Sequence, residues 1–531
     1  MGKNTAELAL LALVGLCAVY LWRLLPIYPD EIAFLTWVSR VSFDGWTRLS
    51  STQFCESSSM APITGPLLLP ASLYSIFGLI GRYDVTRMIG LIIGIGIPVI
   101  YFMALYKQSR NSICLTATFL FVCGVRPSMV GLLRPESFVI ASLMLCAYLV
   151  YIQGTITSRL KQNLLAFVVL VAVSMALYPH PKGLYFLPVY MFTLFALLNR
   201  RFDFICWTCL LFLTAWFSYV INEKQLFHCP ESPSWEAATL AYNINPLHFS
   251  DAPLSFVSEI YRNVLSRDYV TLFSKLLFVE KYDAGYLPNL SDAPMAKVAN
   301  GLLIVAVFIT GIAFIACFNL ARIKHKSYPW RKTVFCLLVL VSLFLHHLTN
   351  KTLTFYEVGF WTSILLLIMP LFGPMADEEA ELSFLSAATV VCAFIACLAS
   401  FYVVGEYMIP HVFNARFAGP DTPILDWHDN AAQYQQIDQT CHVGAGVGRI
   451  VHDDATYFLV RKYPKPIAIT YALKLGPQEA VNWFRRANVS ALVMQCVAFG
   501  AIAPFLTAEE NQSTYHAGNL CCLRFDQQTK P

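Results

Sequence analysis

AELALLALVGLCAVYLWRLLP at residues 6–26, followed directly by IYPDE at 27–31, decides the fold class of this chain. A run of this length crosses hydrocarbon only as a helix, because lipid offers no partners for backbone polar groups. Lys3 precedes the run and no small-residue cleavage site follows it, so we expect a retained membrane helix rather than a signal peptide. Two adjacent carboxylates, Asp30 and Glu31, then stand at its end.

The composition extends this reading to the whole chain. Of 531 residues, 57% are hydrophobic and 13% are charged, whereas soluble domains carry about 25% charged residues. The net charge is +4, and the lysines and arginines are spread through loops instead of forming one basic stripe, so nucleic acid is not an expected partner. The sequence therefore predicts a polytopic α-helical membrane protein.

The remaining apolar runs set the number of spanning helices. Stretch 62–80 is also apolar, but Pro62, Pro66 and Pro70 interrupt it. Proline removes a backbone donor and clashes with the preceding turn, so we place this stretch as re-entrant or interfacial. The other runs predict eleven spanning helices, near 6–26, 86–106, 113–130, 137–155, 163–179, 184–199, 203–221, 298–320, 333–349, 356–374 and 384–404.

Basic residues decide the orientation of these helices. With 62–80 not counted, they gather in the loops on one side of the membrane, and such loops are normally cytoplasmic. The acidic connection at 377–381 is the exception, and acidic residues weigh little in this rule. We therefore expect the N-terminus inside and the C-terminus outside. The basic residues are Lys3, Lys107, Arg110, Arg159, Lys161, Arg200, Arg201, Arg322, Lys324, Lys326, Arg331 and Lys332.

The chain divides into a transmembrane part, 1–404, and a soluble part, 405–531. Two large loops of the transmembrane part, 27–85 and 222–297, fall on the outer side. In the first, Ile32–Phe43 has apolar residues at the spacing of one helix face, which predicts a helix lying in the membrane interface.

The soluble part has the pattern of an α/β domain. Short apolar runs predict strands at Gly448–Val451, Ile467–Tyr471, Ala491–Met494 and Cys521–Phe525, and the periodicity of Gln478–Ala487 predicts an amphipathic helix. The glycine-rich segment 441–448 lacks the spacing of a dinucleotide-binding loop, so we interpret it as a turn.

Sixteen cysteines do not indicate a metal site, because most lie inside predicted helices and behave there as small apolar residues. Six fall outside the helices, and an even number in an oxidising compartment favours disulfides of unknown connectivity. The most testable pairing is Cys441 with Cys496, Cys521 or Cys522. The six are Cys55, Cys229, Cys441, Cys496, Cys521 and Cys522.

Asp30 and Glu31 admit two interpretations. Asp30 is able to cap the N-terminus of a helix beginning near Ile32, which is a common role for aspartate. Alternatively, Asp30 is a base at the membrane surface that takes the proton of an attacking hydroxyl, while Glu31 orients the substrate or holds a divalent cation. The sequence leaves the presence of a metal unknown.

Other charged residues gather at the following outer helix ends. Arg126 and Arg134 precede Glu136. Either Arg134 forms an interfacial ion pair with Glu136, which contributes little by itself, or the two arginines clamp phosphate oxygens. His180 and Lys182 lie at the next outer end, where few basic residues are expected. Snorkelling to the interface and contact with a phosphate are alternative explanations for Lys182.

A further cluster lies at the outer ends of the ninth and tenth predicted helices: His346, His347, Lys351, Tyr356 and Glu357. Adjacent histidines on a helix point about 100° apart, so His346 and His347 are not a chelating pair. Lys351 and Tyr356 either contact a sugar or phosphate or anchor the helix end.

The order and spacing of the short motifs in this chain resemble those of the GT-C glycosyltransferases. Within that group, the chain is similar to the branch that contains protein O-mannosyltransferases and the lipid A aminoarabinose transferase. The resemblance covers 1 to about 375. Its motifs are Tyr28-Pro29-Asp30-Glu31, Thr86-Arg87-Met88-Ile89-Gly90, Glu136, Lys182-Gly183 with Leu187-Pro188, and Lys351 through Tyr356 to Pro370.

The resemblance implies an inverting transfer of a sugar from a polyprenyl-phosphate donor to a glycan, lipid or protein acceptor on the outer face of the membrane. It implies that Asp30 is the catalytic carboxylate, Glu136 a second active-site acid and Lys182 a donor-phosphate contact. Two departures bear on the acceptor and on metal dependence: segment 61–67 lacks the charged motif common in this branch, and Glu136 replaces the usual aspartate.

Two readings from other classes compete with this one. A transporter or flippase also uses intramembrane charges, but it normally shows internal repeat symmetry, which the hydropathy pattern lacks. A scaffold leaves Asp30, Glu136 and Lys182 unexplained. We expect a bacterial inner membrane, with the soluble domain in the periplasm. Four Asn-X-Ser/Thr triplets on the outer side would be glycosylation acceptors in a eukaryote, so the membrane of the endoplasmic reticulum is the alternative location.

Overall fold

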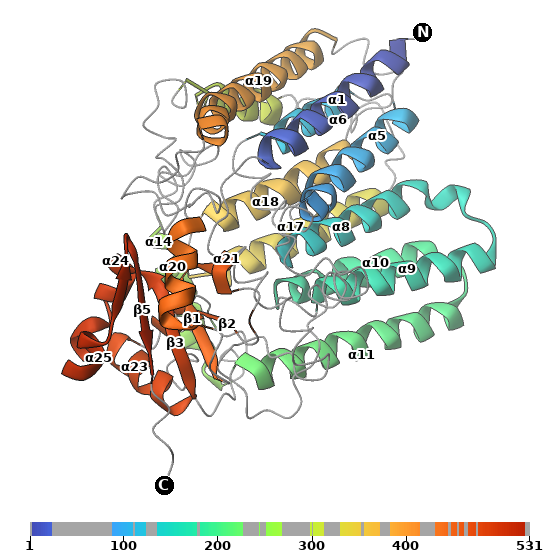
Figure 1. The fold of residues 1–531 in the computed structure, drawn as a ribbon. Coiled ribbons are helices and arrows are strands. Elements are labelled where there is room, and N and C mark those ends of the chain that lie inside the picture. The colour runs from blue at the N-terminus through green and yellow to red at the C-terminus, as the bar shows by residue number, and fades with distance from the viewer. Residues whose placement is uncertain are drawn as a thin grey trace.

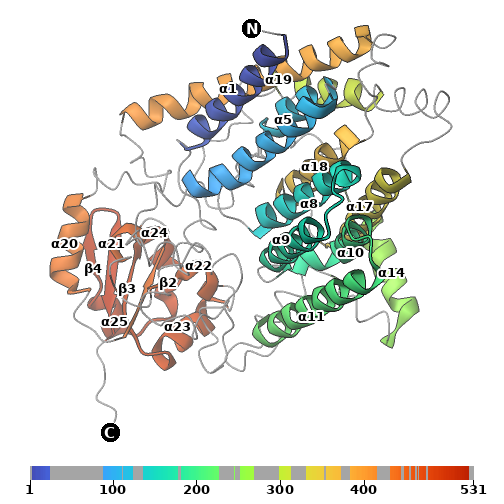
Figure 2. The same ribbon diagram turned by 90° about the vertical axis from the view of Figure 1, so that its right-hand side faces the viewer.

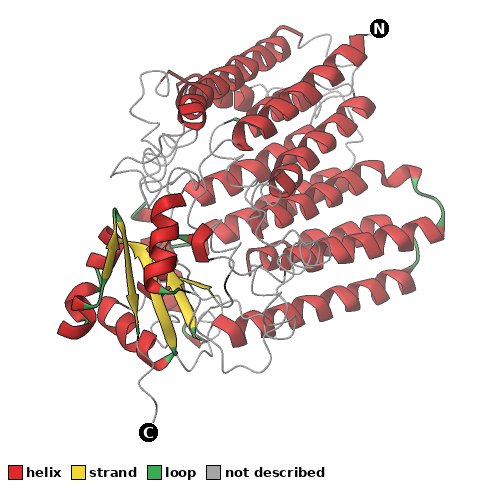
Figure 3. Ribbon diagram, in the orientation of Figure 1, coloured by secondary structure: helices red, strands yellow, loops and turns green. Residues whose placement is uncertain are grey.

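Helices make up most of the chain, and a small sheet lies near its C-terminus (Figure 3). The computed structural model describes residues 3–23, 88–109, 112–123, 135–177, 181–226, 244, 251–267, 298–299, 301–312, 330–351, 355–371, 383–414, 431–443, 448–453, 456–460, 463, 466–473 and 476–525. The interfacial helix predicted at 32–43 and the interrupted stretch 62–80 lie outside these residues.

Six helices in the described ranges are long and apolar enough to cross a membrane. They are α1 (Lys3–Arg23), a helix at Met88–Ser109 that contains the π-turn η1 (Ile92–Gly96) and α5 (Ile97–Ser109), α8 (Pro135–Ile152), α9 (Arg159–Leu177), α11 (Arg201–Leu226) and α17 (Trp330–Thr349). The prediction of a helical membrane protein is confirmed.

Five further predicted segments coincide with apolar helices whose described windows are shorter, at 10–17 residues. They are α6 (Ser112–Phe121), α10 (Leu187–Leu197), Gly301–Ile312, α18 (Phe355–Ile368) and the stretch Ala387–Val403 within α19 (Ser383–Asn414). Each of the eleven predicted segments thus overlaps a helix. Helix α19 continues past 404, where the soluble part was expected to begin.

The helices lie alongside one another, with α1, α6 and α19 at one edge of the layer and α9, α10 and α11 at the other (Figures 1 and 2). Helices α8, α17 and α18 pack between these groups. Large apolar side chains on the helices at the edges of the layer are exposed, including Leu213 and Trp216 of α11. Exposed apolar surface of this extent is what a lipid-facing helix requires.

Polar side chains link neighbouring helices inside this layer. The Tyr101 hydroxyl on α5 donates to the Leu367 carbonyl of α18 at 2.8 Å. Arg159 at the start of α9 donates two hydrogen bonds, at 2.9 and 2.8 Å, to the Asp203 carboxylate at the start of α11. A bidentate arginine–carboxylate contact fixes geometry as well as charge, so this pair sets the spacing of α9 and α11 at that end.

The C-terminal part is an α/β domain beside the helical layer (Figures 1 and 2). Its five-stranded sheet has the order β2-β1-β3-β5-β4. Strands β1, β2 and β3 are parallel, and β5 runs antiparallel to both β3 and β4. The strands are β1 (Arg449–His452), β2 (Pro466–Ala468), β3 (Val489–Gln495), β4 (Tyr515–Ala517) and β5 (Leu520–Arg524).

Helices cover both faces of this sheet. Helix α23 (Pro477–Arg486) buries Val481, Trp483 and Phe484 against one face, and α20 (Ala431–Cys441) packs on the other. The short elements α21 (Tyr457–Val460), α22 (Ile469–Ala472), α24 (Cys496–Gly500) and α25 (Ala508–Gln512) complete the domain. Gly448 lies where a Cβ atom would come within 2.3 Å of the Asn488 carbonyl, so β1 and β3 approach there too closely for a side chain.

Most predicted elements of this domain are present, with one correction. The run Ile467–Tyr471 is not one strand: β2 ends at Ala468, and the chain turns into α22. The predicted turn begins at His442, where φ is positive, while 444–447 lie outside the described residues.

Two disulfides attach neighbouring elements to opposite faces of β5. Cys522 bonds Cys441 at the end of α20, and Cys521 bonds Cys496 at the start of α24. Adjacent strand residues point to opposite faces, which lets two consecutive cysteines serve both sides of the sheet. The expected pairing of Cys441 with one of the C-terminal cysteines is therefore present, with Cys522 as the partner.

His452 on β1 is a fully buried histidine inside this domain. Its Nδ1–H donates to the Asp453 carbonyl at 2.8 Å, and its Nε2 atom has no hydrogen-bond partner. Burial lowers the pKa of His452 from 6.5 to about 4. The folded domain therefore holds a neutral imidazole in a range of pH where the unfolded chain binds a proton.

We expect acidification from pH 7.5 to 4.5 to cost the domain about 2.5 kcal/mol through His452 alone. This stability is fully present above pH 6.5, falls as pH drops below the unfolded pKa, and levels off near pH 4. Hydrogen exchange of the β1 and β3 amides in the full-length protein, corrected for intrinsic rates, measures the opening free energy. His452→Gln cannot titrate, and an equally steep pH profile in that variant would contradict the assignment.

Candidate active site

Three charged side chains meet at one end of the helical layer. Glu136 lies in the first turn of α8, and Lys182 lies in the 3-10 segment η3 (Pro181–Phe186) that leads into α10. The Lys182 Nζ atom donates to Glu136 Oε1 at 2.8 Å and lies 3.5 Å from Oε1 of Glu357. Glu357 belongs to the first turn of α18, so the lysine stands between the N-terminal turns of two helices.

These three side chains are largely removed from solvent. The exposed fractions of the Glu136, Lys182 and Glu357 side chains are 1%, 9% and 10%. Carboxylates are favoured near helix N-termini by the backbone dipoles. A buried ion pair does not by itself stabilise a fold, because desolvating the charges costs as much as their attraction returns. An arrangement of this kind is therefore weak evidence for a stabilising role and better evidence for a functional one.

The Gly183 backbone next to this lysine packs against its own chain. A Cβ atom at Gly183 would come within 2.9 Å of the Ala176 carbonyl in α9. Any side chain at this position would therefore clash with α9. Gly183 matters for the site by letting η3 lie against α9, which places Lys182 opposite Glu136.

An aromatic group adjoins the charged cluster. The Phe360 ring lies 5.5 Å from Lys182 Nζ and 5.5 Å from the ring of His346 on α17. His346 is 2% exposed, and its Nδ1 atom accepts a hydrogen bond from Trp361 Nε1 at 2.9 Å. A neutral imidazole that accepts at Nδ1 carries its proton on Nε2. Phe360 thus lies between Lys182, the predicted phosphate contact, and His346 of the cluster at the ninth and tenth predicted helices.

His347 faces a different group, as the helical spacing predicts. Arg267 Nη1 lies 2.8 Å from its Nε2 atom, and the Trp361 ring packs 4.5 Å from the imidazole. Both rings therefore lie against Trp361, but the printed nitrogen contacts differ: His346 Nδ1 accepts from Trp361, whereas His347 Nε2 lies beside Arg267.

Lys351 lies just after the end of α17 and pairs with a glutamate of another helix. Its Nζ atom is 2.8 Å from Oε1 of Glu259 on α14 (Pro253–Leu265), and both side chains are about one-third exposed. Asn263 of the same helix donates to the carbonyls of Leu348 and Asn350 at 3.2 and 2.9 Å. Helix α14 therefore satisfies carbonyl groups at the C-terminal end of α17, which have no partners within the helix.

Several predicted site residues lie outside the described ranges: Asp30, Glu31, Arg126, Arg134 and His180. Tyr356 is the second residue of α18, and only its backbone is described. Of the predicted residues, the structure brings Glu136, Lys182 and His346 into one neighbourhood and pairs Lys351 with Glu259 of α14.

Glu357 is a site residue to which the sequence pattern assigns no role. Its sequence position resembles that of Glu136, since each is an acidic residue in the first turn of an apolar helix. The two glutamates are far apart in the chain, and only the packing of α18 against α8 brings both to Lys182.

A metal ion has one candidate group among the described residues: Cys496, His516 and Cys521. Both of its sulfurs are engaged in a disulfide, so they are not thiolate ligands in this oxidation state. Between Glu136 and Glu357 lies the Lys182 ammonium.

Comparison with known proteins identifies the fold. No family model matches the sequence, and no curated protein matches it. ArnT from Cupriavidus metallidurans, solved with undecaprenyl phosphate, is similar with a TM-score of 0.52 and 10% identity over 100% of both chains. An oligosaccharyltransferase from Archaeoglobus fulgidus, solved with zinc and sulfate, matches with a TM-score of 0.48 and 10% identity, over 94% of this chain and 70% of that one.

ArnT is the lipid A aminoarabinose transferase and has the GT-C fold. The overlay covers the whole length of both proteins, including the C-terminal domain. The GT-C fold expected from the order of the sequence motifs is therefore confirmed.

Proposed function

We propose that this chain is an inverting glycosyltransferase that moves a sugar from a polyprenyl-phosphate donor to a glycan, lipid or protein acceptor. The observation that carries the proposal is the buried Lys182, held between Glu136 and Glu357 in a fold shared with a protein solved with undecaprenyl phosphate. A buried cation at a membrane-helix end suits the anionic group that such a lipid brings there.

The leaving group explains what Lys182 would do. When the sugar departs, negative charge develops on the lipid phosphate, and a fixed cation stabilises that charge. The contact of Nζ with Glu136 is a short hydrogen bond, whereas the 3.5 Å contact with Glu357 is longer than a normal one. A phosphate oxygen would therefore replace Glu357 more easily than Glu136, and Glu136 would keep the ammonium in place.

The other predicted residues complete the proposal. Asp30 would take the proton of the acceptor hydroxyl, and Glu31 would orient the substrate or hold a divalent cation if one is needed. A single direct displacement needs one base. Further phosphate contacts are proposed for His180, Arg126 and Arg134, and sugar contacts for Lys351, Tyr356 and His346.

Binding of undecaprenyl phosphate to the purified full-length protein tests the donor class. We expect saturable binding of one lipid, and loss of that binding for undecaprenol, which has the same chain and no phosphate. Native mass spectrometry in detergent distinguishes the two. Equal retention of both lipids would mean that only the apolar chain is recognised, and the proposed donor would then be wrong.

The proposed orientation places the site and the C-terminal domain on the outer, periplasmic side of a bacterial inner membrane, with the N-terminus cytoplasmic. The basic loops support this arrangement. We expect S513C to react with an impermeant maleimide in intact cells, and K326C to react only after permeabilisation. Both variants are made in a background without other accessible thiols. The reverse labelling pattern would refute the orientation.

A further inference from the structure

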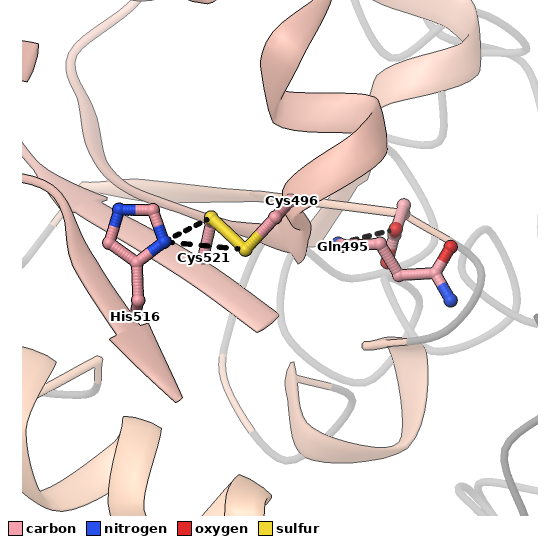
Figure 4. Close-up of a disulfide and its surroundings, with 5 residues drawn as sticks. Gln495, Cys496, His516 and Cys521 are labelled. Atoms are coloured by element: carbon pink, nitrogen blue, oxygen red, sulfur yellow. Dashed lines mark hydrogen bonds between the residues drawn. A yellow bond between two sulfur atoms is a disulfide. The ribbon is translucent and has the colours of Figure 1, made fainter. Parts of the chain in front are cut away.

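The Cys496–Cys521 disulfide differs from its neighbour in having a histidine beside both sulfurs. The Nδ1 atom of His516, on β4, lies 3.2 Å from Sγ of Cys521 and 3.6 Å from Sγ of Cys496 (Figure 4). His516 is exposed and Cys496 is half-buried, whereas Cys521 is 1% exposed. The other disulfide joins Cys441 and Cys522, which are 5% and 0% exposed.

We infer that Cys496, Cys521 and His516 form a reducible disulfide that becomes a binding site for Zn²⁺ or a similar thiophilic ion once a small thiol opens it. The exposures and the position of His516 determine which bond breaks and which group leaves. This inference concerns the C-terminal domain and does not depend on the proposed glycosyl transfer.

The opening begins at the accessible sulfur. A thiolate attacks Sγ of Cys496, a new sulfur–sulfur bond forms between them, and the bond to Cys521 breaks. The Cys521 thiolate leaves beside His516, whose Nδ1–H donates a hydrogen bond to it. A second thiolate then attacks the mixed disulfide and releases Cys496. Overall, two small thiols become one disulfide, and their two electrons and two protons reduce Cys496–Cys521 to two thiols.

The backbone keeps the two thiols together after the bond is broken. The Cys496 amide donates to the Asn519 carbonyl at 2.8 Å, and Gln495 pairs with Leu520 in the antiparallel ladder of β3 and β5. The Gln495 amide is also held by Asp453 Oδ2 at 2.7 Å (Figure 4). None of these hydrogen bonds involves the disulfide, so the Cα atoms of Cys496 and Cys521 would stay close to their present separation of 4.9 Å.

The geometry that remains suits a tetrahedral zinc ion. With Zn–S near 2.3 Å and Zn–N near 2.0 Å, tetrahedral angles place nitrogen and sulfur ligands about 3.5 Å apart and two sulfurs about 3.8 Å apart. The Nδ1 atom of His516 lies 3.6 and 3.2 Å from the two sulfurs, so small shifts satisfy the first requirement. The second requires only that the freed sulfurs rotate apart. Two thiolates and one imidazole supply three ligands and leave a fourth position for water.

The first part of the test follows the two disulfides separately in the full-length protein in detergent. Reduced glutathione is added, samples are alkylated over time, and mass spectrometry quantifies each pair. We expect Cys496–Cys521 to open at least about tenfold faster than Cys441–Cys522. H516A should slow this opening several-fold. H442N is the control, because it replaces an exposed histidine beside Cys441 at a positive φ that asparagine tolerates. It should leave the rate at which Cys496–Cys521 opens unchanged.

The second part adds Co²⁺, a spectroscopic substitute for Zn²⁺, after Cys496–Cys521 has opened and while Cys441–Cys522 is intact. We expect the absorption bands of a tetrahedral thiolate site and protection of Cys496 and Cys521 from alkylation. C496S and H516A should both lose the bands. Equal opening rates for the two disulfides would overturn the inference, and so would alkylation of Cys496 and Cys521 that the metal leaves unchanged.

Discussion

Lys182→Met should lower the stability of the purified protein by about 3 to 5 kcal/mol, because it removes the cation that donates a 2.8 Å hydrogen bond to the buried Glu136 carboxylate. The Glu136 side chain is 1% exposed, so water cannot replace the lost partner. Methionine keeps the apolar stem and fills a similar volume, so the loss of stability measures the effect of removing the charge. Thermal unfolding in detergent, compared with wild type, measures this effect.

The double variant Lys182→Met/Glu136→Gln separates a structural lysine from one that contacts the donor. Removing the charges of Lys182 and Glu136 leaves the buried Glu357 carboxylate as before, so we expect the part of the lost stability that belongs to Glu136 to return. Turnover should not return, because loss of a charged phosphate contact costs about 2 to 5 kcal/mol of binding or transition-state stabilisation. Glu136→Gln alone supplies the reference for the turnover of the pair.

The ion pair of Arg159, whose side chain is 55% exposed, and Asp203 provides a control outside the site. It also joins two helix starts, with N–O distances of 2.8 and 2.9 Å, but it involves α9 and α11 and no predicted site residue. Arg159→Met should therefore change stability without changing the turnover of the folded protein. If Lys182→Met/Glu136→Gln regained both stability and turnover, the lysine would be structural and the proposed phosphate contact would be wrong.

The fold class was predictable because the membrane imposes few solutions. Lipid cannot satisfy backbone polar groups, so long apolar runs such as 6–26 and 333–349 become helices whatever their detailed sequence. The C-terminal sheet follows a weaker rule. Strand β4 has three residues, Tyr515–Ala517, and no alternation long enough to identify it. Its place in the sheet depends on pairing with β5, which sequence periodicity does not specify.

The candidate site was predictable as single residues and not as an arrangement. Glu136 and Lys182 were selected because charges at outer helix ends are costly and therefore functional candidates. Their hydrogen bond spans 46 positions in sequence. It depends on the packing of η3 against α9, which the small volume of Gly183 allows. Glu357 had no assigned role because its partner becomes apparent only when α18 packs on α8.

Asp30→Asn should abolish glycosyl transfer while the protein expresses and folds normally. The amide has nearly the shape of the carboxylate, but it cannot accept the proton of the acceptor hydroxyl. A positioned general base contributes about 100-fold to 10,000-fold in rate, so turnover should fall by at least that lower factor. Purified enzyme with a polyprenyl-phosphate sugar and acceptor supplied measures the loss.

The same substitution distinguishes catalysis from helix capping. Asparagine is as good an N-cap as aspartate, so a capping role predicts almost no change for Asp30→Asn and a loss of about 1 kcal/mol in stability for Asp30→Ala. Asp44→Asn is the matched control, since Asp44 lies in the same outer loop but outside the Tyr28–Glu31 motif. Substantial turnover by Asp30→Asn would assign Asp30 to the cap. Because capping is indifferent to the amide and proton transfer is not, one isosteric change decides between the two roles that the sequence left open.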